Sequence, residues 1–353
     1  MKYEIWKIII VFVSSWAFCF FLTPLFRKLG KHFSITDRSL RGKPAKGEVP
    51  LLGGWALYLP FTFLIFFLIP PSSQRNAFLL GSGLMVLLGF VDDLYDIKPW
   101  IKLLFQIGII AMTIYIGNIE ITFVSNPFNT GKYIYINEPF AFLITLLWVV
   151  AITNALNLVD GLDGLASGLS IISLIAFLLL GIIMKRSETL LLYITILIGS
   201  NIGFLRYNFP PASIFLGDAG SLFLGFTLGI ITVLGTFKTA TVVSLMVPIL
   251  ILGIPILDTV FAVVRRTIEG KNIFRADTAH IHHRLLDLGF TERQSVDLIY
   301  IVSIILNVIA VLFRNINIVI LFLLYAIVGT SMFFFLYRGF FKRNKSIVKN
   351  NRK

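Results

Sequence analysis

The sequence has little charge and almost no cysteine. Of its 353 residues, 14% are charged and 57% are hydrophobic. Apolar runs of about 20 residues recur along the chain, as in proteins that cross a membrane several times. This composition excludes an ordinary soluble protein. The single cysteine, Cys19, excludes an internal disulfide and a metal site built from several thiolates, and we interpret it as a small apolar filler.

The sequence is rich in long hydrophobic segments. A window of about 19 residues predicts about eleven membrane spans, and hence an all-α, polytopic integral membrane helical bundle. We expect one transmembrane domain over residues 1–337 and a basic cytoplasmic tail over 338–353. The segments "TFV" and "KYIYI" are expected to form a small hairpin outside the bilayer. The predicted spans are 5–25, 51–69, 77–92, 101–117, 139–157, 164–184, 189–206, 219–236, 240–264, 295–313 and 316–337.

Lysine and arginine are distributed unevenly between the two sides of this bundle. Cytoplasmic loops retain these residues; with the connection 26–50 placed inside, 23 of them face the cytoplasm and 8 face out. The N-terminus is therefore expected outside and the C-terminus inside. The net charge of +13 is expected to anchor the protein beside anionic headgroups, and it requires no nucleic acid. Beyond that connection, the cytoplasmic set is Lys98, Lys102, Arg206, Arg265, Arg266, Lys271, Arg275, Arg284, Arg293 and the basic residues after 337.

The acidic residues also gather on the cytoplasmic side, although Asp and Glu have little influence on orientation. Fourteen of the 18 lie there, and a charge at a helix centre costs about 2.5 to 3.5 kcal/mol on insertion scales. Several acids at helix ends on one side predict a shared polar pocket. They lie in "GFVDDLYDIKPW" (Asp92, Asp93, Asp96), "NALNLVDGLDGLASG" (Asp160, Asp163), "FLGDAGSLFLG" (Asp218), "IPILDTVFAVVRR" (Asp258) and two basic connections.

The residue types in this predicted pocket indicate a chemistry. Carboxylate and amide oxygens without thiolates suit a hard cation such as Mg2+ or Mn2+, which in turn suits phosphate ligands. Basic side chains would surround that cation with groups that bind anions. The combination predicts phosphoryl transfer at the membrane surface. The basic candidates are Lys46, Arg265, Arg266, Arg284 and the histidines of "HIHHRL", which are His280, His282 and His283.

Glycines support the same interpretation. Gly161, Gly164 and Gly168 follow i, i+3, i+7 spacing, which leaves a bare helix face that a helix or a ligand can approach. The sequence "GDAG" is expected to open a helix. The free N–H groups and the positive dipole end of that helix would favour a nearby anion.

Four motifs together resemble a known family. "VDDLYD", "NALNLVDGLDGLASG", "FLGDAGS" and "HIHHRL", in this order, are similar to the polyprenyl-phosphate N-acetylhexosamine-1-phosphate transferases of glycosyltransferase family 4, over residues 5–337. "HIHHRL" and "DDLYDIKPW" resemble the branch that loads N-acetylglucosamine 1-phosphate (GlcNAc-1-phosphate) for teichoic acid, O-antigen (lipopolysaccharide) or related glycans. The resemblance implies transfer from a UDP-N-acetylhexosamine to undecaprenyl phosphate with release of UMP. It also implies Mg2+, with Mn2+ as an alternative, an active site on the cytoplasmic face of the inner cell membrane, and a homodimer.

Individual roles also follow from the resemblance. Asp218 is implied as the principal Mg2+ ligand, with Asn157 close to the metal or the diphosphate. Asp92 and Asp93 match the acidic pair assigned to binding or deprotonating the lipid phosphate. The connection "RGKPAKGEVP" lacks the histidine that the family often carries there, and Lys46 matches a basic position of the translocase branch.

The remaining roles concern the nucleotide and the diphosphate. Asp160, which we count as catalytic, and Asp163, with Gly161 and Leu162, match the nucleotide-recognition segment. Phe215 would stack on uracil. The histidine loop would hold the diphosphate and the sugar, with His282 and His283 as catalytic residues. The other substrate-binding candidates are Asn154, Asn208, Arg265, Arg266, His280 and Arg284.

The expected chemistry follows from charge. A lipid monophosphate, with a second pKa near about 6 by analogy with phosphoserine, is already largely a dianion at neutral pH. Asp92 is therefore expected to position this phosphate more than to deprotonate it. We expect direct in-line attack on the sugar-linked phosphate, and a covalent aspartyl-phosphate route stays open.

Other readings of the sequence stay open as well. A phospho-MurNAc-pentapeptide translocase is the second enzyme of the same superfamily. An ion-coupled secondary transporter also has intramembrane acids and glycine-interrupted helices, and a noncatalytic lipid-binding scaffold is a third class. Asp258 lies seven and eight residues before Arg265 and Arg266, roughly on their helical face, so we expect it to form a structural ion pair.

Overall fold

The computed structural model describes residues 5–37, 49–125, 133–236, 246–268 and 280–312. The predicted span 316–337, the predicted tail 338–353 and Lys46 lie outside the described residues. The described elements are the helices α1 (Ile5–His32), α2 (Gly53–Leu68), α3 (Ser73–Tyr95), α4 (Pro99–Gly117), α5 (Glu138–Val159), α6 (Leu165–Ile183), α7 (Glu188–Asn208), α8 (Gly217–Thr236), α9 (Met246–Ile251), α10 (Gly253–Ile268), α11 (Ile281–Asp287) and α12 (Glu292–Leu312), and the strands β1 (Phe123–Ser125) and β2 (Tyr133–Tyr135).

The helices confirm the predicted fold class. In the described residues, eight helices are long and apolar enough to cross a membrane, namely α1, α3, α4, α5, α6, α7, α8 and α12. Helix α2 is also apolar but has 16 residues. The chain is therefore a multi-pass, helical membrane protein. Each of these nine helices overlaps a predicted span and begins and ends within several residues of it.

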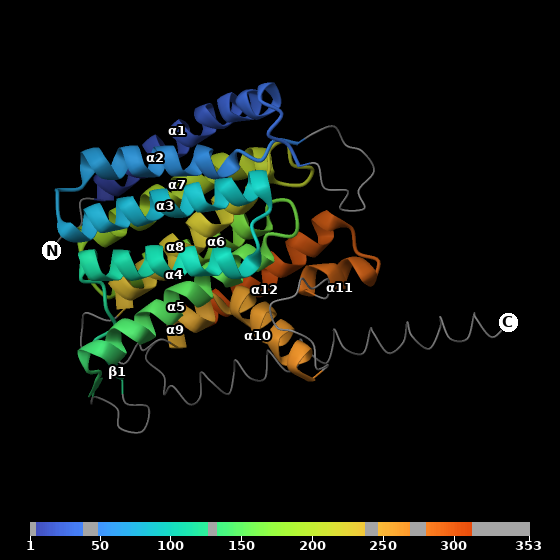
Figure 1. Ribbon diagram of the computed structural model, residues 1–353. Helices are drawn as coiled ribbons and strands as arrows, with labels where there is room; N and C mark the ends of the chain where they lie inside the picture. Colours follow the sequence, from blue (N-terminus) through green and yellow to red (C-terminus); the bar gives the residue numbers. More distant parts are fainter. Residues whose placement is uncertain (1–4, 38–48, 126–132, 237–245, 269–279, 313–353) are drawn as a thin grey trace.

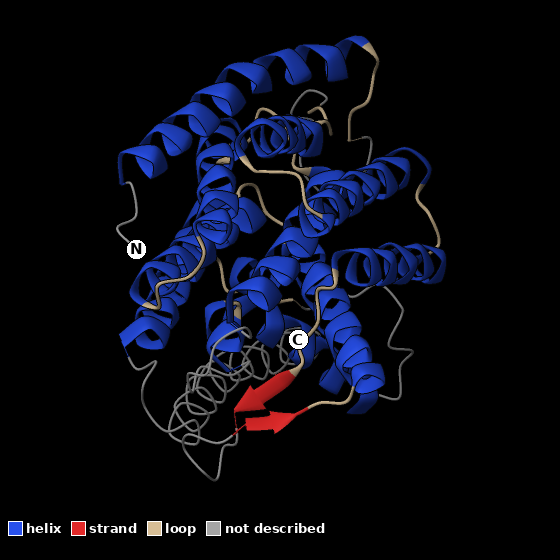
Figure 2. Ribbon diagram, turned by 90° about the vertical axis from the view of Figure 1, so that its left-hand side faces the viewer, coloured by secondary structure: helices blue, strands red, loops and turns tan. Residues whose placement is uncertain are grey.

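The helices run side by side, with different features at the two ends of the bundle (Figure 1). The start of α1 and the β-hairpin lie at one end, whereas the α3–α4 turn and α11 lie at the other. Figure 2 looks onto the first end and shows the hairpin as two strands beside the helices. The strands pair antiparallel with Phe123 opposite Tyr135, which confirms the predicted hairpin.

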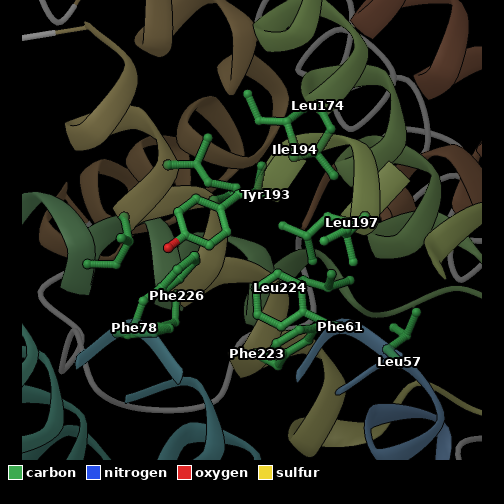
Figure 3. Packing of buried hydrophobic residues seen from close by; sticks show 14 of the residues in the cluster. Leu57, Phe61, Phe78, Leu174, Tyr193, Ile194, Leu197, Phe223, Leu224 and Phe226 are labelled. Carbon is green, nitrogen blue, oxygen red and sulfur yellow. The ribbon is translucent and has the colours of Figure 1, made fainter. Parts of the chain in front are cut away.

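Helix α8 lies at the centre of the core. It packs against α3, α5 and α2, and its aromatic side chains meet those of neighbouring helices (Figure 3). Phe223 contacts Phe61 edge to face, with ring centroids 5.3 Å apart. At Gly225 an added Cβ would lie 2.6 Å from the Cα of Thr153 on α5, so only glycine permits this approach of two backbones. Asp218 therefore lies at the start of a tightly packed helix.

Of the three glycines predicted to form a bare helix face, only Gly168 lies on α6; Gly164 is the N-cap residue of α6 and Gly161 lies in the turn before it. The Tyr300 hydroxyl of α12 donates to the carbonyl of Gly164 at 2.6 Å. A Cβ at Gly168 would lie 1.9 Å from that hydroxyl oxygen. Gly164 and Gly168 thus allow α12 to approach α6.

The predicted span 240–264 is broken where the structure describes it. Helix α9 ends at Ile251 and α10 begins at Gly253, and α10 runs obliquely to the other helices (Figure 1). Pro255 has no N–H to donate to the carbonyl of Ile251, four residues earlier. Ser173 Oγ of α6 and Asn307 Nδ2 of α12 donate to that carbonyl instead, each at 3.2 Å. The helix within the predicted span is therefore interrupted at Leu252, and neighbouring side chains satisfy the freed carbonyl inside the bundle.

Candidate active site

Asp93, in the last turn of α3, caps the start of α8. Its Oδ1 accepts from the N–H of Asp218 at 2.7 Å and its Oδ2 from the N–H of Ala219 at 3.1 Å. Gly217, with φ of +72°, supplies the left-handed turn that leads into the helix. A carboxylate at this position satisfies free N–H groups and lies at the positive end of the helix dipole. Asp93, predicted as a catalytic residue, therefore fixes Asp218 relative to α3.

Lys102, in the first turns of α4, lies between Asp92, Asp218 and Asn157, which we call the acidic group. Its Nζ is 2.6 Å from Asp92 Oδ2, 3.0 Å from Asp218 Oδ1 and 3.2 Å from Asn157 Oδ1. The structure thus brings oxygens from α3, α5 and α8 together around one ammonium on α4. The Lys102 side chain is 13% exposed and that of Asp92 is 7% exposed, so this attraction is screened less than that of a surface pair.

From the sequence, Lys102 was predicted only as one of the basic residues that set the orientation in the membrane. The usable signal was that Lys102 is the one charged residue between 99 and 117, a stretch that is otherwise apolar. A charge within a predicted span is a candidate functional residue by default. Two of its three partners lie 55 and 116 residues away in the chain, a separation that helical periodicity does not reveal.

Asn157 connects the acidic group to the end of α5. Its Nδ2 donates to Asp218 Oδ1 and, at 2.8 Å, to Ser221 Oγ, while its Oδ1 faces Lys102. One turn earlier, Asn154 Nδ2 donates to Gln106 Oε1 of α4 at 2.7 Å and to the carbonyl of Val150. Asn154 was predicted to bind substrate. In the structure its side-chain amide joins α5 to α4 through Gln106.

The donor set around Lys102 fits a hard divalent cation. The carboxylates of Asp92 and Asp218 and the amide oxygen of Asn157 all lie within 3.2 Å of one cationic atom. Oxygen ligands of this kind are those that Mg2+ and Mn2+ prefer. Among the described residues no three His, Cys, Asp or Glu side chains group as metal ligands, so an amide oxygen has to complete such a set. Asp218 is the more accessible carboxylate, with 35% of its side chain exposed.

The turn after α5 carries the residues predicted to recognise the nucleotide. Asp160 is the C-cap residue of α5, and Gly164 has a φ of +76°. Asp163 Oδ2 accepts from the N–H of Ala212 at 2.9 Å. The Leu162 side chain is buried in a hydrophobic cluster with Val159 and Leu165, so any contact of this residue with a ligand would have to come from its backbone.

The loop 209–216 is held from several sides. Asn208 is buried; its Nδ2 donates to the carbonyl of Ile214 at 3.0 Å and its Oδ1 accepts from Ser167 Oγ at 3.3 Å. Phe215, half-buried on this loop, is tied through its backbone to Pro50 and Gly53. The structure therefore brings Asp163, Asn208 and Phe215 to one loop, with the first two shaping it.

The histidine segment lies against the same turn. His280 and His282 are buried, at 5% and 2% exposure, whereas His283 and Arg284 are half-buried on α11. A Cβ at Gly161 would lie 2.1 Å from His282 Nε2, so the absence of a side chain there lets the ring reach the turn. Asp160, Gly161 and the histidines thus form a second group, joined to the acidic group by the end of α5.

Asp258 is buried on α10 and contacts the start of the histidine segment. Its Oδ2 lies 2.9 Å from His280 Nδ1 and its Oδ1 accepts from the N–H of Ile281 at 2.8 Å. Arg266 is half-buried on α10, and the Arg265 side chain lies outside the described residues. The predicted ion pair of Asp258 with these arginines stays a prediction.

Comparison with known proteins adds independent information. The family model described as glycosyl transferase family 4 matches residues 76–236. A Bacillus subtilis (strain 168) protein named "Probable undecaprenyl-phosphate N-acetylglucosaminyl 1-phosphate transferase" is 35% identical over 311 residues, which cover 88% of this chain and 86% of that protein. An Escherichia coli (strain K12) protein named "Undecaprenyl-phosphate alpha-N-acetylglucosaminyl 1-phosphate transferase" is 31% identical over 314 residues, 86% and 82% of the two chains. A Mycobacterium leprae "Decaprenyl-phosphate N-acetylglucosaminephosphotransferase" is 31% identical over 279 residues, 71% and 70% of the two chains.

Replacing Lys102 should destabilise the protein through the carboxylates it holds. Lys102→Met leaves Asp92 and Asp218 facing each other without a counter-charge, which we expect to cost roughly 1 to 3 kcal/mol after allowance for the partial exposure of Asp218. The melting temperature in detergent should fall, and adding Asp92→Asn to Lys102→Met should restore part of it. Lys98→Met, at the exposed N-cap position just before the same helix, is the matched control and should melt like the unaltered protein. Equal melting of the Lys102→Met and Lys98→Met variants would contradict this account.

Proposed function

We propose, since the chain belongs to glycosyl transferase family 4, that it transfers GlcNAc-1-phosphate from a UDP-sugar to undecaprenyl phosphate. The products are UMP and undecaprenyl diphosphate carrying the sugar, for cell-envelope polysaccharide synthesis. The relatives named above act, by their names, on polyprenyl phosphates and N-acetylglucosamine. These names do not favour the translocase or the transporter. The observation that carries the proposal is the convergence of Asp92, Asp218 and Asn157 on one cationic point.

The reaction requires two anions to approach each other. A lipid phosphate dianion must reach the diphosphate of the UDP-sugar, and their repulsion has to be offset by fixed positive charge. Lys102 brings one positive charge to the acidic group, where its ammonium lies between two carboxylates. His283 and Arg284 are half-buried on α11 and would contribute further positive charge or hydrogen-bond donors, helped by Arg265, Arg266 and Lys46.

A divalent cation would share the acidic group with Lys102. Asp218, Asn157 and Asp92 would hold it, and when bound it would neutralise phosphate charge and stabilise the departing UMP. The chosen ion is Mg2+, with Mn2+ as the alternative. Lys102 now lies where these oxygens converge, so its ammonium and the cation would have to divide the oxygens between them.

Asp92 and Asp93 would have different tasks. Both oxygens of Asp93 accept backbone N–H groups of α8, so Asp93 would keep the metal-binding residue in place. One oxygen of Asp92 accepts from the N–H of Ile97, and the other forms an ion pair with Lys102. Asp92 would therefore orient the lysine toward the lipid phosphate. Because that phosphate is largely a dianion at neutral pH, positioning rather than proton removal is the larger need, and we propose direct in-line attack.

The donor nucleotide would bind near the turn after α5. Asp160 and the backbone of Gly161 and Leu162 would contact it, and Phe215 would stack on the uracil. Asp163 and Asn208 hold the loop that carries Phe215, so they would act on the nucleotide by shaping its site. Asn154 would contribute by joining α4 to α5.

We also propose a membrane arrangement. The chain would cross the inner cell membrane about eleven times as one domain, with its N-terminus outside and its C-terminus in the cytoplasm. The excess of lysine and arginine in alternate connections supports this orientation, and the active site would then face the cytoplasm. The proposed homodimer is tested by the native mass of the detergent-solubilised protein, where the mass of a single chain would refute it.

The activity itself is measured as UMP release from a UDP-sugar. Purified protein should release UMP from UDP-GlcNAc when both undecaprenyl phosphate and Mg2+ are added, and faster than from UDP-GalNAc or UDP-MurNAc-pentapeptide. Asp218→Ala should lower the rate by roughly 100- to 1000-fold, because it removes charge stabilisation at the reacting phosphate. Asp297→Asn, an exposed change on α12, is the control and should keep full activity.

Two results would count against this reaction. Absence of UMP release with every UDP-N-acetylhexosamine, or full activity of Asp218→Ala, would overturn the proposed function. A burst of UMP without any polyprenyl phosphate would overturn direct attack and favour an aspartyl-phosphate route.

The orientation is tested by labelling introduced cysteines. The natural Cys19 is fully buried, so a new exposed cysteine would be the reactive thiol. Tyr135→Cys on the hairpin and Leu288→Cys at the end of α11 replace side chains that are 77% and 41% exposed. A membrane-impermeant maleimide should label Tyr135→Cys in intact cells and Leu288→Cys only after the membrane is opened. The reverse pattern would invert the proposed orientation.

A further inference from the structure

Asp258 is a buried carboxylate to which the proposed reaction gives no task. It lies on α10 with 3% of its surface exposed. One oxygen accepts from the backbone N–H of Ile281, the first residue of α11, at 2.8 Å, and the other lies 2.9 Å from His280 Nδ1. Asp258 therefore joins α10 to the point where the histidine segment enters α11, and at this burial it is not placed to touch a substrate.

An ionised carboxylate at this contact would determine which nitrogen of His280 carries a proton. An ionised carboxylate only accepts hydrogen bonds, so Nδ1 has to donate to it. In the neutral ring, Nε2 is then the acceptor. A carboxylate that holds a histidine in one tautomer and one orientation is a recurrent device in active sites and metal sites.

The ring of His280 is in turn stacked on the next histidine. The His280 and His282 rings are parallel within 2°, with centroids 5.8 Å apart, and the His282 and His283 centroids are 4.3 Å apart. His282 lies against Gly161 in the turn after α5. A row of contacts therefore runs from Asp258 through His280 and His282 to the turn proposed to bind the nucleotide.

We propose that Asp258 is a positioning residue for the transfer reaction and acts through His280. It holds the plane and the tautomer of the His280 ring, and thereby keeps the histidine segment against Gly161 with His283 and Arg284 facing the phosphates. This inference rests on the proposed function, since it gives the histidine segment a role in that reaction. It divides the segment into a buried supporting part, His280 and His282, and a part that reaches the substrate.

A purely structural role of Asp258 has to be separated from this one. The carboxylate also caps α11 through Ile281, and loss of a cap destabilises a helix without any special effect on a histidine. Asp258→Asn makes the distinction. The amide oxygen still accepts from Ile281, whereas the amide nitrogen now donates, so His280 has to accept at Nδ1 and carry its proton on Nε2. An Asp→Asn change of this kind in a serine-protease triad keeps the geometry and lowers kcat by about 10,000-fold through the wrong tautomer.

The first measurement is the tautomer itself. The chain has four histidines, so protein labelled with 15N-histidine gives four imidazoles to assign by NMR. The unaltered protein should show His280 with a protonated Nδ1, and Asp258→Asn should show it with a protonated Nε2 and a bare Nδ1. An unchanged His280 spectrum in Asp258→Asn would overturn the proposal, whatever the enzyme assay shows.

The second measurement is kinetic. Asp258→Asn should lower kcat by roughly 10- to 100-fold, the range found for residues that orient a metal-binding histidine, with the KM for UDP-GlcNAc changed less than about threefold. Asp258→Glu, which retains the carboxylate, should recover part of the loss. His280→Gln lacks a donor at the Nδ1 position and should lower kcat similarly. Combining it with Asp258→Asn should cause no further loss, because both changes act through one ring.

The controls separate the possible failures. Asp297→Asn should retain the kcat of the unaltered protein. A normal kcat in Asp258→Asn, or losses that multiply when it is combined with His280→Gln, would overturn the positioning role. A fall in kcat matched by a fall in melting temperature and not relieved by Asp258→Glu would assign Asp258 to capping alone. If the unaltered protein releases no UMP, the proposed function fails, whereas the NMR measurement still decides whether Asp258 sets the His280 tautomer.

Discussion

The rest of the site depends on one shared positive charge. Lys102 brings an ammonium to within 3.2 Å of oxygens from Asp92, Asp218 and Asn157, and those residues come from three other helices. Without a cation between them, the two carboxylates would repel each other at the end of an apolar bundle. The folded protein thus contains a place for positive charge that its own lysine occupies. A chain whose substrates are two phosphates and whose metal would be divalent has use for such a place, because negative charge has to be balanced at each stage of the reaction.

Packing between helices fixes the positions of these charged groups. Asp93 binds the first N–H groups of α8, and Gly225 lets α8 lie against α5. Asp218 and Asn157 therefore lie on helices whose backbones are held in fixed positions, α8 by Asp93 of α3 and by its close packing on α5. The end of α5 then continues into the turn at Gly161, where His282 lies. The acidic group and the histidine group thus meet the same stretch of chain, the end of α5 and the turn after it, and binding two substrates requires such a fixed relation.

Much of the fold and part of the site were predictable from the sequence. Apolar runs gave the spans because length and hydropathy are local properties, and the acids were found because a charge beside a membrane span is costly. The break between α9 and α10 was missed because a proline inside a span is tolerated when neighbours satisfy the freed carbonyl, and those neighbours, Ser173 and Asn307, lie far away in the sequence. Lys102 was undervalued for the same reason. Its partners belong to other helices, and a sequence without structure does not tell which helices touch. The His280 contact of Asp258 was likewise hidden, since 22 residues separate the two.

The most direct measurement of the central claim is a titration of detergent-solubilised protein with Mn2+, followed by the electron paramagnetic resonance signal of the free ion. Three oxygens that converge on one cationic point should bind about one Mn2+ per chain, and Mg2+ should displace it. Asn157→Leu should abolish this binding, because it removes the one oxygen of the set that is not a carboxylate. If Asn157→Leu binds Mn2+ as tightly as the unaltered protein, the three oxygens are not a cation site and the account of this active site is wrong.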